Sequence, residues 1–418
     1  MKYVAKLMRA CRPVLAALIL APAALAYGQE VTLVAGGDIE WSRIVQVPVI
    51  TNDAVRGEGR GAGAGSNRRA DGWIPVPYLI TPESKAYLEQ TLNITLENPN
   101  AHHLTSIQYG LNFRTPQEMA QYPFRNIRQL LSGADIAFAN LETPLSDKAR
   151  RTGAFRTPVA FAEGLAWAGI DVVSNANNHA LDAEGEGLLD TKEALWRAGV
   201  GAVGTGRDLE DARRPFILER NGLRVAFLGY SMFVNAGDAA FATPERSGVV
   251  PLDPFIIKED IRRVRGRADY VAVSFHWSVE NSQDVLPADQ AFARDIIDAG
   301  ADIVLGHHPH VPRGFEVYKG KAIFYSFGNL IFGHAHTYWM DNYLARLTLT
   351  RDGITKIEMI PVGGRGNALS QPAPLRGREA QVVLQDIKER SAKLETTVEI
   401  VGDVGIVTIG SGPRAGSR

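Results

Sequence analysis

Short apolar stretches recur along the chain, and polar residues with metal-binding capacity follow them again and again. The stretches have the pattern of β-strands, and helices are predicted between them, for example at 185–198 and 289–299. Strands that alternate with helices predict a layered α/β core. In such sheets ligands bind beyond the carboxyl ends of the strands, so side chains far apart in sequence can converge there. The predicted strands are 31–35, 135–139, 170–174, 200–203, 223–228, 270–275, 303–305 and 322–326, with an antiparallel pair over 342–361.

The residues that follow these strands form a mixed set of oxygen and nitrogen ligands, which suits Mn, Fe, Zn or Mg/Ca. A carboxylate between two such cations can hold them close enough to clamp a substrate oxygen and activate water. Taken singly, Asp38 is better explained as a turn residue, while residues 177–178 are equally explained as a helix cap and His276 as a buried imidazole. The 306–310 segment most favours metal or phosphate binding. The set comprises Asp38, Asn140, Glu142, Asn177, Asn178, His179, His276, His307, His308 and His310.

The composition excludes several other classes of protein. Hydrophobic residues make up 45% of the 418 residues and charged residues 22%, as in ordinary globular proteins. The formal net charge of -1 provides no overall basic field, so we expect no nucleic acid as a partner. A single cysteine, Cys11, excludes an intramolecular disulfide framework and a cysteine-ligated zinc site.

The first 26 residues have the layout of a secretory signal peptide. Four basic residues precede or flank the start of an apolar run from Val14 to Leu25, and Ala24-Leu25-Ala26 supplies the small residues of a cleavage site. The run is short for a transmembrane span, and an uncleaved anchor is the alternative. We therefore expect an exported protein, periplasmic or at the cell surface after cleavage near Ala26.

The remaining chain is predicted to form one domain over residues 27–400, followed by a C-terminal strand and flexible tail over 401–418. The segment 44–125 separates the first strand from the next and is too long for a simple connection. It is interpreted as an inserted subdomain or lid, because it leaves the sheet at the end where ligands bind. Its helical patterns lie at 82–97 and 115–132, the second extending past the insertion.

Six motifs, in their order and spacing, resemble the CapA family of poly-γ-glutamate capsule biosynthesis proteins, which belongs to the calcineurin-like metallophosphatase superfamily. The resemblance covers roughly residues 31–361, interrupted by 44–125. The motifs are Gly36-Gly37-Asp38 with Arg43; Asn140-Leu141-Glu142-Thr143-Pro144; Asn175-Ala176-Asn177-Asn178-His179 with Asp182; Ser274-Phe275-His276-Trp277 with Glu280; Gly306-His307-His308-Pro309-His310-Val311; and Tyr325-Ser326-Phe327-Gly328-Asn329.

The resemblance implies a four-layer α/β/β/α sandwich with an inserted segment after the first strand and a site for divalent metal ions, two by analogy, between the sheets. Glu142 takes the position of the bridging carboxylate, with Asn140 as the runner-up. Glu40 stands where the superfamily often has a histidine ligand, and Ser278 stands where the family commonly has glycine. The implied metal ligands are Asp38, Glu142, Asn178, His276, His308 and His310.

The function implied is that of an exported metal-dependent hydrolase of the CapA type, acting in synthesis, export or processing of an anionic surface polymer such as poly-γ-glutamate. His179 would protonate the leaving group as general acid. Arg43 would pair with an anionic substrate group, or else form a surface ion pair. The expected partners are the polymer, or a phosphoester or γ-glutamyl substrate, and membrane export machinery. The alternatives are a non-catalytic polymer-binding or assembly component and a metal-dependent enzyme that modifies γ-glutamyl amides.

Overall fold

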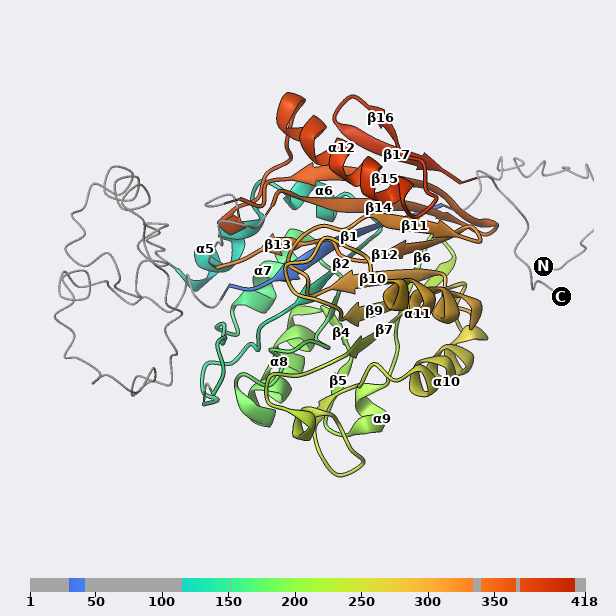
Figure 1. Ribbon diagram of the computed structural model, residues 1–418. Helices are drawn as coiled ribbons and strands as arrows, with labels where there is room; N and C mark the ends of the chain where they lie inside the picture. Colours follow the sequence, from blue (N-terminus) through green and yellow to red (C-terminus); the bar gives the residue numbers. More distant parts are fainter. Residues whose placement is uncertain (1–29, 42–114, 151, 334–339, 366–368, 410–418) are drawn as a thin grey trace, which may run out of the picture.

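Two β-sheets lie face to face in the computed structural model, which describes residues 30–41, 115–150, 152–333, 340–365 and 369–409 (Figure 1). Within those residues the first sheet has nine strands: β1 (Val31–Ile39), β2 (Ile136–Leu141), β3 (Val172–Ser174), β4 (Gly201–Val203), β13 (Asn329–Ile331), β14 (Asn342–Thr350), β15 (Gly353–Val362), β16 (Glu399–Val401) and β17 (Val404–Thr408). Their order is β16-β17-β15-β14-β1-β2-β3-β4, and β13 pairs with β1. The run from β1 to β4 is parallel, whereas β14 is antiparallel to β1.

The second sheet has six strands among the described residues, in the order β11-β12-β10-β9-β7-β6. Its central strands β7, β9, β10 and β12 are parallel, and β6 and β11 flank them as antiparallel edges. A short ribbon pairs β5 (Thr205–Gly206) with β8 (Gly248–Val249). The strands are β6 (Phe216–Arg220), β7 (Leu223–Ser231), β9 (Tyr270–His276), β10 (Ile303–His307), β11 (Phe315–Tyr318) and β12 (Lys321–Phe324).

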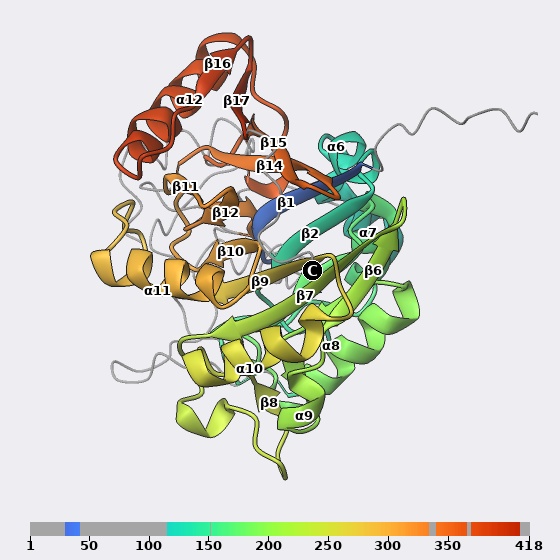
Figure 2. The same cartoon turned by 90° about the vertical axis from the view of Figure 1, so that its right-hand side faces the viewer.

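Helices cover the outer face of each sheet (Figures 1 and 2). The helices are α5 (Pro116–Gln121), α6 (Arg128–Ser132), α7 (Phe161–Ala168), α8 (Glu184–Ala198), α9 (Leu209–Ala212), α10 (Pro254–Arg265), α11 (Pro287–Asp298) and α12 (Gly377–Ala392), with 3₁₀ turns η1 (Tyr122–Phe124) and η2 (Asp238–Ala240). One buried cluster joins β1, β2 and β3 to α6, α7 and α8, and another joins β7, β9 and β10 to α10 and α11. The four-layer α/β/β/α sandwich expected from the sequence is therefore confirmed.

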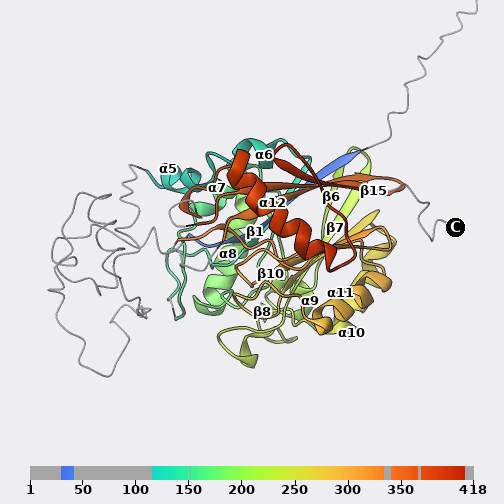
Figure 3. The same cartoon turned by 45° about the horizontal axis from the view of Figure 1, so that its top comes forward.

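The largest apolar cluster lies between the two sheets. Alternate residues of each strand point into it, as the two-residue repeat of a strand requires. Phe138 of the first sheet stacks on Phe227 of the second, with ring centroids 5.6 Å apart and an interplanar angle of 5°. Helix α12 contributes Val383, Leu384 and Ile387 to the same cluster and contacts β15 and β17 of one sheet and β11 of the other (Figure 3). The inter-sheet core and helix α12, which contacts both sheets, thus fix the position of one sheet relative to the other.

Strand β1 continues past the point where the sequence places its end. It runs to Ile39 instead of Ala35, because β13 pairs with its last residues as an added parallel neighbour. A β-carbon on Gly37 would lie 1.8 Å from the carbonyl oxygen of Gly328, so glycine is required for this approach. The pairing brings the Asp38 amide to 3.0 Å from the same oxygen. The Gly36-Gly37 pair therefore serves close strand packing beside Asp38.

The single helix predicted over 115–132 is wrong in its continuity. Thr115 caps α5, and its hydroxyl accepts a hydrogen bond from the Glu118 amide at 3.0 Å. Pro123 then lacks the amide hydrogen that a continuing helix needs, and the chain passes through η1 before α6 begins. Helix α5 and η1 lie in the helix layer beside α7.

Other sequence predictions fall outside the described residues. The signal peptide over 1–26, Arg43 and residues 44–114 of the inserted segment belong to this group, so the lid stays a prediction. In the part of the chain that is described, no helix combines the length and apolar composition needed to cross a bilayer.

The inter-sheet core generates a stability prediction. Phe138→Ala removes a fully buried ring from between the sheets and should lower the free energy of unfolding by about 3–5 kcal/mol. Phe255 is 83% exposed on α10, and Phe255→Ala should change the free energy of unfolding by less than about 0.5 kcal/mol. Urea unfolding of both variants beside the wild type measures the difference. Equal losses would contradict the assignment of Phe138 to the core.

Candidate metal centre

The carboxyl ends of the central strands meet at one edge of the sandwich. In the first sheet Asp38 near the end of β1 lies opposite Asn140 of β2, and in the second sheet His276 ending β9 lies opposite His307 ending β10. Residues 175–179 follow directly after β3. Because both sheets end here, side chains from both converge in the space between them.

Five of the predicted ligands form two overlapping groups. Glu142, His276 and His308 place one ligand atom each within 4.8 Å of one another, and so do Asp38, Glu142 and His310. All five side chains are buried, and Glu142 belongs to both groups. The arrangement has the form of two adjacent sites that share one carboxylate.

Direct distances describe how the groups meet. Glu142 Oε1 lies 3.6 Å from His276 Nε2 and 3.9 Å from His310 Nε2. Asp38 Oδ2 lies 3.5 Å from His310 Nδ1. The side-chain oxygen of Asn178 lies 2.8 Å from His276 Nε2 and so adds an amide oxygen to the first group. The structure thus brings all six predicted ligands together at one place.

The donor atoms fit divalent metal ions. Among the described residues, neither buried carboxylate oxygen of Glu142 has a hydrogen-bond partner, and neither does Nδ1 of His308. A buried carboxylate with no partner is costly, and a bound cation removes that cost. Carboxylate, amide and imidazole groups form the mixed oxygen and nitrogen set that Mn, Fe and Zn accept. We conclude that the two groups are suited to hold metal.

Burial and neighbouring charges shift the protonation of these groups in the metal-free protein. Burial, together with the charges of Asp38, Glu280 and Glu40, holds the pKa of Glu142 well above its usual range. Burial and the charge of His310 lower the pKa of His308 to about 3. Burial also lowers the pKa of His276 well below its usual value. His276 and His308 are therefore neutral at ordinary pH, the form in which imidazole binds metal.

Asp38 is shifted in the opposite direction from Glu142. Burial by itself would raise the pKa of Asp38, but the nearby imidazoles of His307 and His310 outweigh it and lower the pKa. His307 Nδ1 lies 3.3 Å from Asp38 Oδ1, and the Asn140 amide donates to the same oxygen at 2.9 Å. Asp38 is thus held as a carboxylate, whereas Glu142 has no such support.

The backbone of the histidine segment is held in an uncommon conformation. His308 and His310 have φ angles of 97° and 59°, in the left-handed region that residues other than glycine rarely adopt. The His308 amide donates to Asp38 Oδ2 at 3.3 Å, and His310 Nδ1 lies 2.8 Å from Asn329 Oδ1. Conformations of this kind persist where the surroundings enforce them, and they cluster at functional sites.

His179 lies beside the ligands. Its Nδ1 is 2.6 Å from Asp182 Oδ2, and its ring lies against Phe155 with centroids 4.2 Å apart. The carboxylate accepts the Nδ1 proton, which leaves Nε2 as the nitrogen that can carry a second proton. The backbone amide of Asn235 donates to the carbonyl of Asn178 at 2.9 Å, which ties this segment to the loop after β7.

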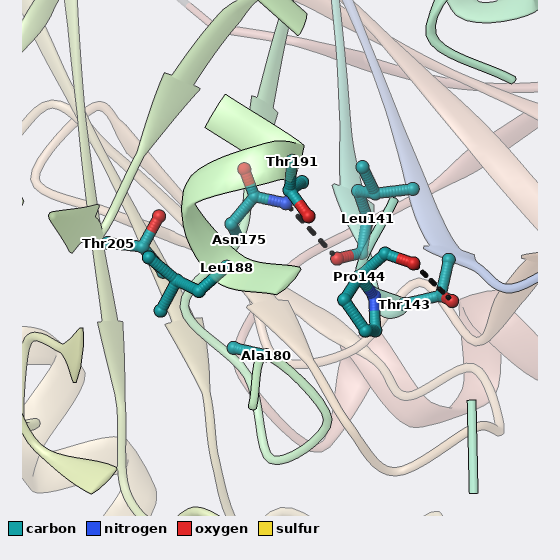
Figure 4. Close-up of a pocket in the computed structure, with 8 residues that line it drawn as sticks. All are labelled: Leu141, Thr143, Pro144, Asn175, Ala180, Leu188, Thr191 and Thr205. Carbon is teal, nitrogen blue, oxygen red and sulfur yellow. Dashed lines mark hydrogen bonds between the residues drawn. The ribbon is translucent and has the colours of Figure 1, made fainter. Parts of the chain in front are cut away.

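Aromatic rings pack directly against two of the histidine ligands. Phe233 meets His308 edge to face with centroids 4.5 Å apart, and Phe332 meets His310 at 5.1 Å. Between residues 141–144 and helix α8 lies a small cavity of about 10 Å³ (Figure 4). That volume suits no more than a water molecule.

Two residues left open by the sequence have other partners in the structure. Asn140, the alternative to Glu142, donates its amide to Asp38 and accepts from Asn177 at 3.2 Å. Glu40 Oε2 accepts a hydrogen bond from the Gly333 amide at 3.0 Å, and Glu40 belongs to neither group of ligands. Both residues are placed to orient their neighbours.

Sequence reasoning missed some residues around the ligands. Phe233 and Asn235 lie in the loop after β7, which carries no recognisable motif. His307 was among the candidate ligands but belongs to neither ligand group: its Nδ1 lies 3.3 Å from Asp38 Oδ1, and its ring packs against Phe138 and Phe327. His307 is the last residue of β10, whereas His308 lies beyond the end of the strand.

The shifted His308 gives a pH-dependent prediction for the metal-free protein. The unfolded chain binds a proton to this histidine below about pH 6.5, whereas the folded chain binds it only near pH 3. Stability should therefore fall as the pH drops through this window, by up to about 1.4 kcal/mol per pH unit from this group. His308→Asn, which tolerates a left-handed backbone, should show a shallower fall. Glu142 acts in the opposite sense but is common to both proteins.

Urea unfolding of the two metal-free proteins at pH 7, 6, 5 and 4 provides the measurement. Parallel pH profiles would show that His308 titrates alike in the folded and unfolded states.

Comparisons with known proteins agree with the motifs and the architecture. The model of the family described as bacterial capsule synthesis protein PGA_cap matches residues 88–334, more than half of the chain. The capsule biosynthesis protein CapA of Bacillus anthracis is 34% identical over 252 residues, which are 58% of this chain and 61% of that protein. The PGA biosynthesis protein CapA of Bacillus subtilis (strain 168) is 31% identical over 290 residues, 68% of this chain and 74% of that protein.

The matched region thus spans less than two thirds of the B. anthracis protein. Among solved structures, the Thermus thermophilus sulfate thiohydrolase SoxB, in complex with glycerol, is 15% identical with a TM-score of 0.40, over 88% of this chain and 61% of that one. This likeness is too low to carry the fold assignment, which rests on the strands and helices of this chain. The family match and the B. subtilis relative carry the assignment: the chain belongs to the PGA_cap family of bacterial capsule synthesis proteins.

Proposed function

We propose that this protein is an exported metal-dependent hydrolase that acts on an anionic surface polymer such as poly-γ-glutamate, during its synthesis, export or processing. The observation that carries the proposal is Glu142, a buried carboxylate without a hydrogen bond that two groups of ligands share. The names of the two Bacillus relatives, which refer to capsule and PGA biosynthesis, support the choice of polymer.

In this proposal the six ligands hold divalent metal ions between the sheets. When bound, such ions act as Lewis acids that activate water and polarise a substrate oxygen. Asp38 and Glu142 provide the negative charge that balances them, and the neutral imidazoles of His276 and His308 provide lone pairs. Asn140 and Asn329 fix the orientation of Asp38 and His310 through hydrogen bonds of 2.9 and 2.8 Å.

His179 is proposed as the general acid. Asp182 holds its Nδ1 proton and fixes the ring, so Nε2 can deliver a proton to the leaving group. The ring packs against Phe155, and its side chain is only 12% exposed, which limits exchange with bulk water. A module that only binds polymer has no need of an oriented imidazole and carboxylate beside its ligands. Arg43, which lies outside the described residues, remains the proposed partner of an anionic substrate group.

Two substitutions separate metal binding from proton transfer. His276→Ala removes one donor from a small ligand set and should lower metal content and turnover together. His179→Ala should keep its metal but lose turnover by on the order of 100-fold or more. Metal content by elemental analysis and rates on aryl phosphates and γ-glutamyl peptides should come from the same preparations.

Each outcome of that comparison has a definite meaning. Full metal occupancy in His276→Ala would refute the ligand assignment. Full activity in His179→Ala would refute the general acid. Metal binding without turnover on either substrate class would favour the non-catalytic polymer-binding component, and turnover of γ-glutamyl peptides alone would favour the amide-modifying enzyme.

Export is a separate part of the proposal and has its own test. The basic residues, the apolar run from Val14 to Leu25 and the cleavage site after Ala26 predict a mature chain that starts near Tyr27. N-terminal sequencing of protein from the periplasm or cell surface of a producing bacterium should find that residue. Soluble cytoplasmic protein that retains Met1 would contradict export.

A further inference from the structure

We propose that Arg313 is a positioning residue whose guanidinium fixes residues 278–282, called here the 278–282 loop, against the His308–His310 segment and so holds these two ligands in place. The inference deepens the metal centre proposed above and rests on it for its metal-binding readout. Among the described residues, the hydrogen bonds of the Arg313 guanidinium go to the 278–282 loop and Asp289, and none goes to a ligand side chain.

Arg313 is fully buried, and its guanidinium donates to the 278–282 loop and to Asp289, which itself accepts a hydrogen bond from this loop. Nε donates to the Ser282 carbonyl at 2.7 Å, and Nη2 donates to the Val279 carbonyl at 3.0 Å. Nη1 donates to the Ser278 hydroxyl at 2.7 Å and lies 3.4 Å from an oxygen of Asp289. Burial lowers the pKa of Arg313 to about 10, so it remains charged at neutral pH. The charged guanidinium donates to two backbone carbonyls and a hydroxyl, and these hydrogen bonds fix the path of the loop.

The 278–282 loop needs such support because its backbone is strained. Ser278 and Asn281 have φ angles of 73° and 60°, both left-handed for residues with a side chain. The Ser278 hydroxyl donates to Asp289 Oδ2 at 2.5 Å while it accepts from Arg313. Serine thus stands at a glycine-like position and is held there by these hydrogen bonds.

The loop in turn contacts the ligand segment. The Asn281 amide donates to the carbonyl of Pro309 at 2.8 Å, between His308 and His310. At the start of the loop, the Trp277 amide donates to the carbonyl of His307 at 3.2 Å. Since His308 and His310 both have left-handed backbones, a fixed Pro309 carbonyl restrains the residues on either side of it. The chain of contacts therefore runs from Arg313 through the loop to two ligands.

A half-buried arginine, Arg213, shows what a purely structural role looks like. Arg213 is 11% exposed and pairs with Asp260 at 2.9 Å and Glu259 at 2.7 Å, joining α9 to α10. Its partners are side chains on a helix, and among the described residues no hydrogen bond or ion pair joins it to the ligand segments. Arg213→Lys is therefore a matched control for Arg313→Lys. Lysine presents a single ammonium and cannot reproduce the fork of donors in either place.

The first experiment compares hydrogen exchange of the two metal-free variants with the wild type. Arg313→Lys should speed exchange in peptides that cover 278–282 and 307–310, whereas Arg213→Lys should leave both peptides unchanged. Addition of guanidinium at a low, non-denaturing concentration to Arg313→Ala should slow that exchange again, and it should not do so for Arg213→Ala. This readout needs no metal, so it tests the positioning role even if the proposed metal centre fails.

The second experiment measures metal affinity. With Mn²⁺ or Zn²⁺ titrated into the metal-free protein, Arg313→Lys should bind about tenfold more weakly than the wild type, because partners that orient ligands typically matter on this scale. Arg213→Lys should bind as the wild type does even if its melting temperature falls. Wild-type exchange and wild-type affinity in Arg313→Lys would overturn the proposal and leave Arg313 as a structural residue.

If the Arg313 variants do not fold, Ser278 provides an independent test. Ser278→Gly loses the hydroxyl but adopts the left-handed backbone without strain, whereas Ser278→Ala loses the hydroxyl and keeps the strain. Exchange at 307–310 and the metal dissociation constant should both rise more in Ser278→Ala than in Ser278→Gly. Equal values for the two variants and the wild type would show that the loop does not position the ligands.

Discussion

Glu142 brings a carboxylate into the middle of the molecule, where neither of its oxygens has a hydrogen bond. The neighbouring charges of Asp38, Glu280 and Glu40 raise its pKa further after burial has done so, and the nearby imidazoles of His276 and His308 are neutral. The protein by itself therefore supplies little to balance this group, and a bound cation would supply what is missing. The rest of the site can be understood as the means of holding ligands around that one carboxylate.

The inter-sheet core makes this convergence possible. His276 comes from the second sheet and Asp38 from the first, so their separation depends on how the sheets pack and not on either strand alone. The stacked pair Phe138 and Phe227 and helix α12 fix the sheets at a constant distance from inside and from one edge. We therefore expect a change deep in the apolar core to alter the geometry of ligands that it does not contact.

Much of the central fold was predictable because buried parallel strands have a strong sequence signal. The strands with Asp38, Glu142, His276 and His308 at their ends were recognised as apolar runs, and their carboxyl ends do converge. The edge strand β6 and helix α12 were not recognised, since their half-buried faces mix polar and apolar residues. Arg313 was missed because it becomes informative only once four distant partners are seen around it.

The strained backbones show why local sequence rules fail near the ligands. His308, His310, Ser278 and Asn281 all adopt left-handed angles, for which local propensity favours glycine. Tertiary contacts hold three of them there: His308 through Asp38, Asn281 through the Pro309 carbonyl and Ser278 through Arg313. Strain and the uncompensated carboxylate both lower the stability of the metal-free protein. A cation bound only by the folded chain would offset these costs, so metal affinity and folding stability should be linked in this protein.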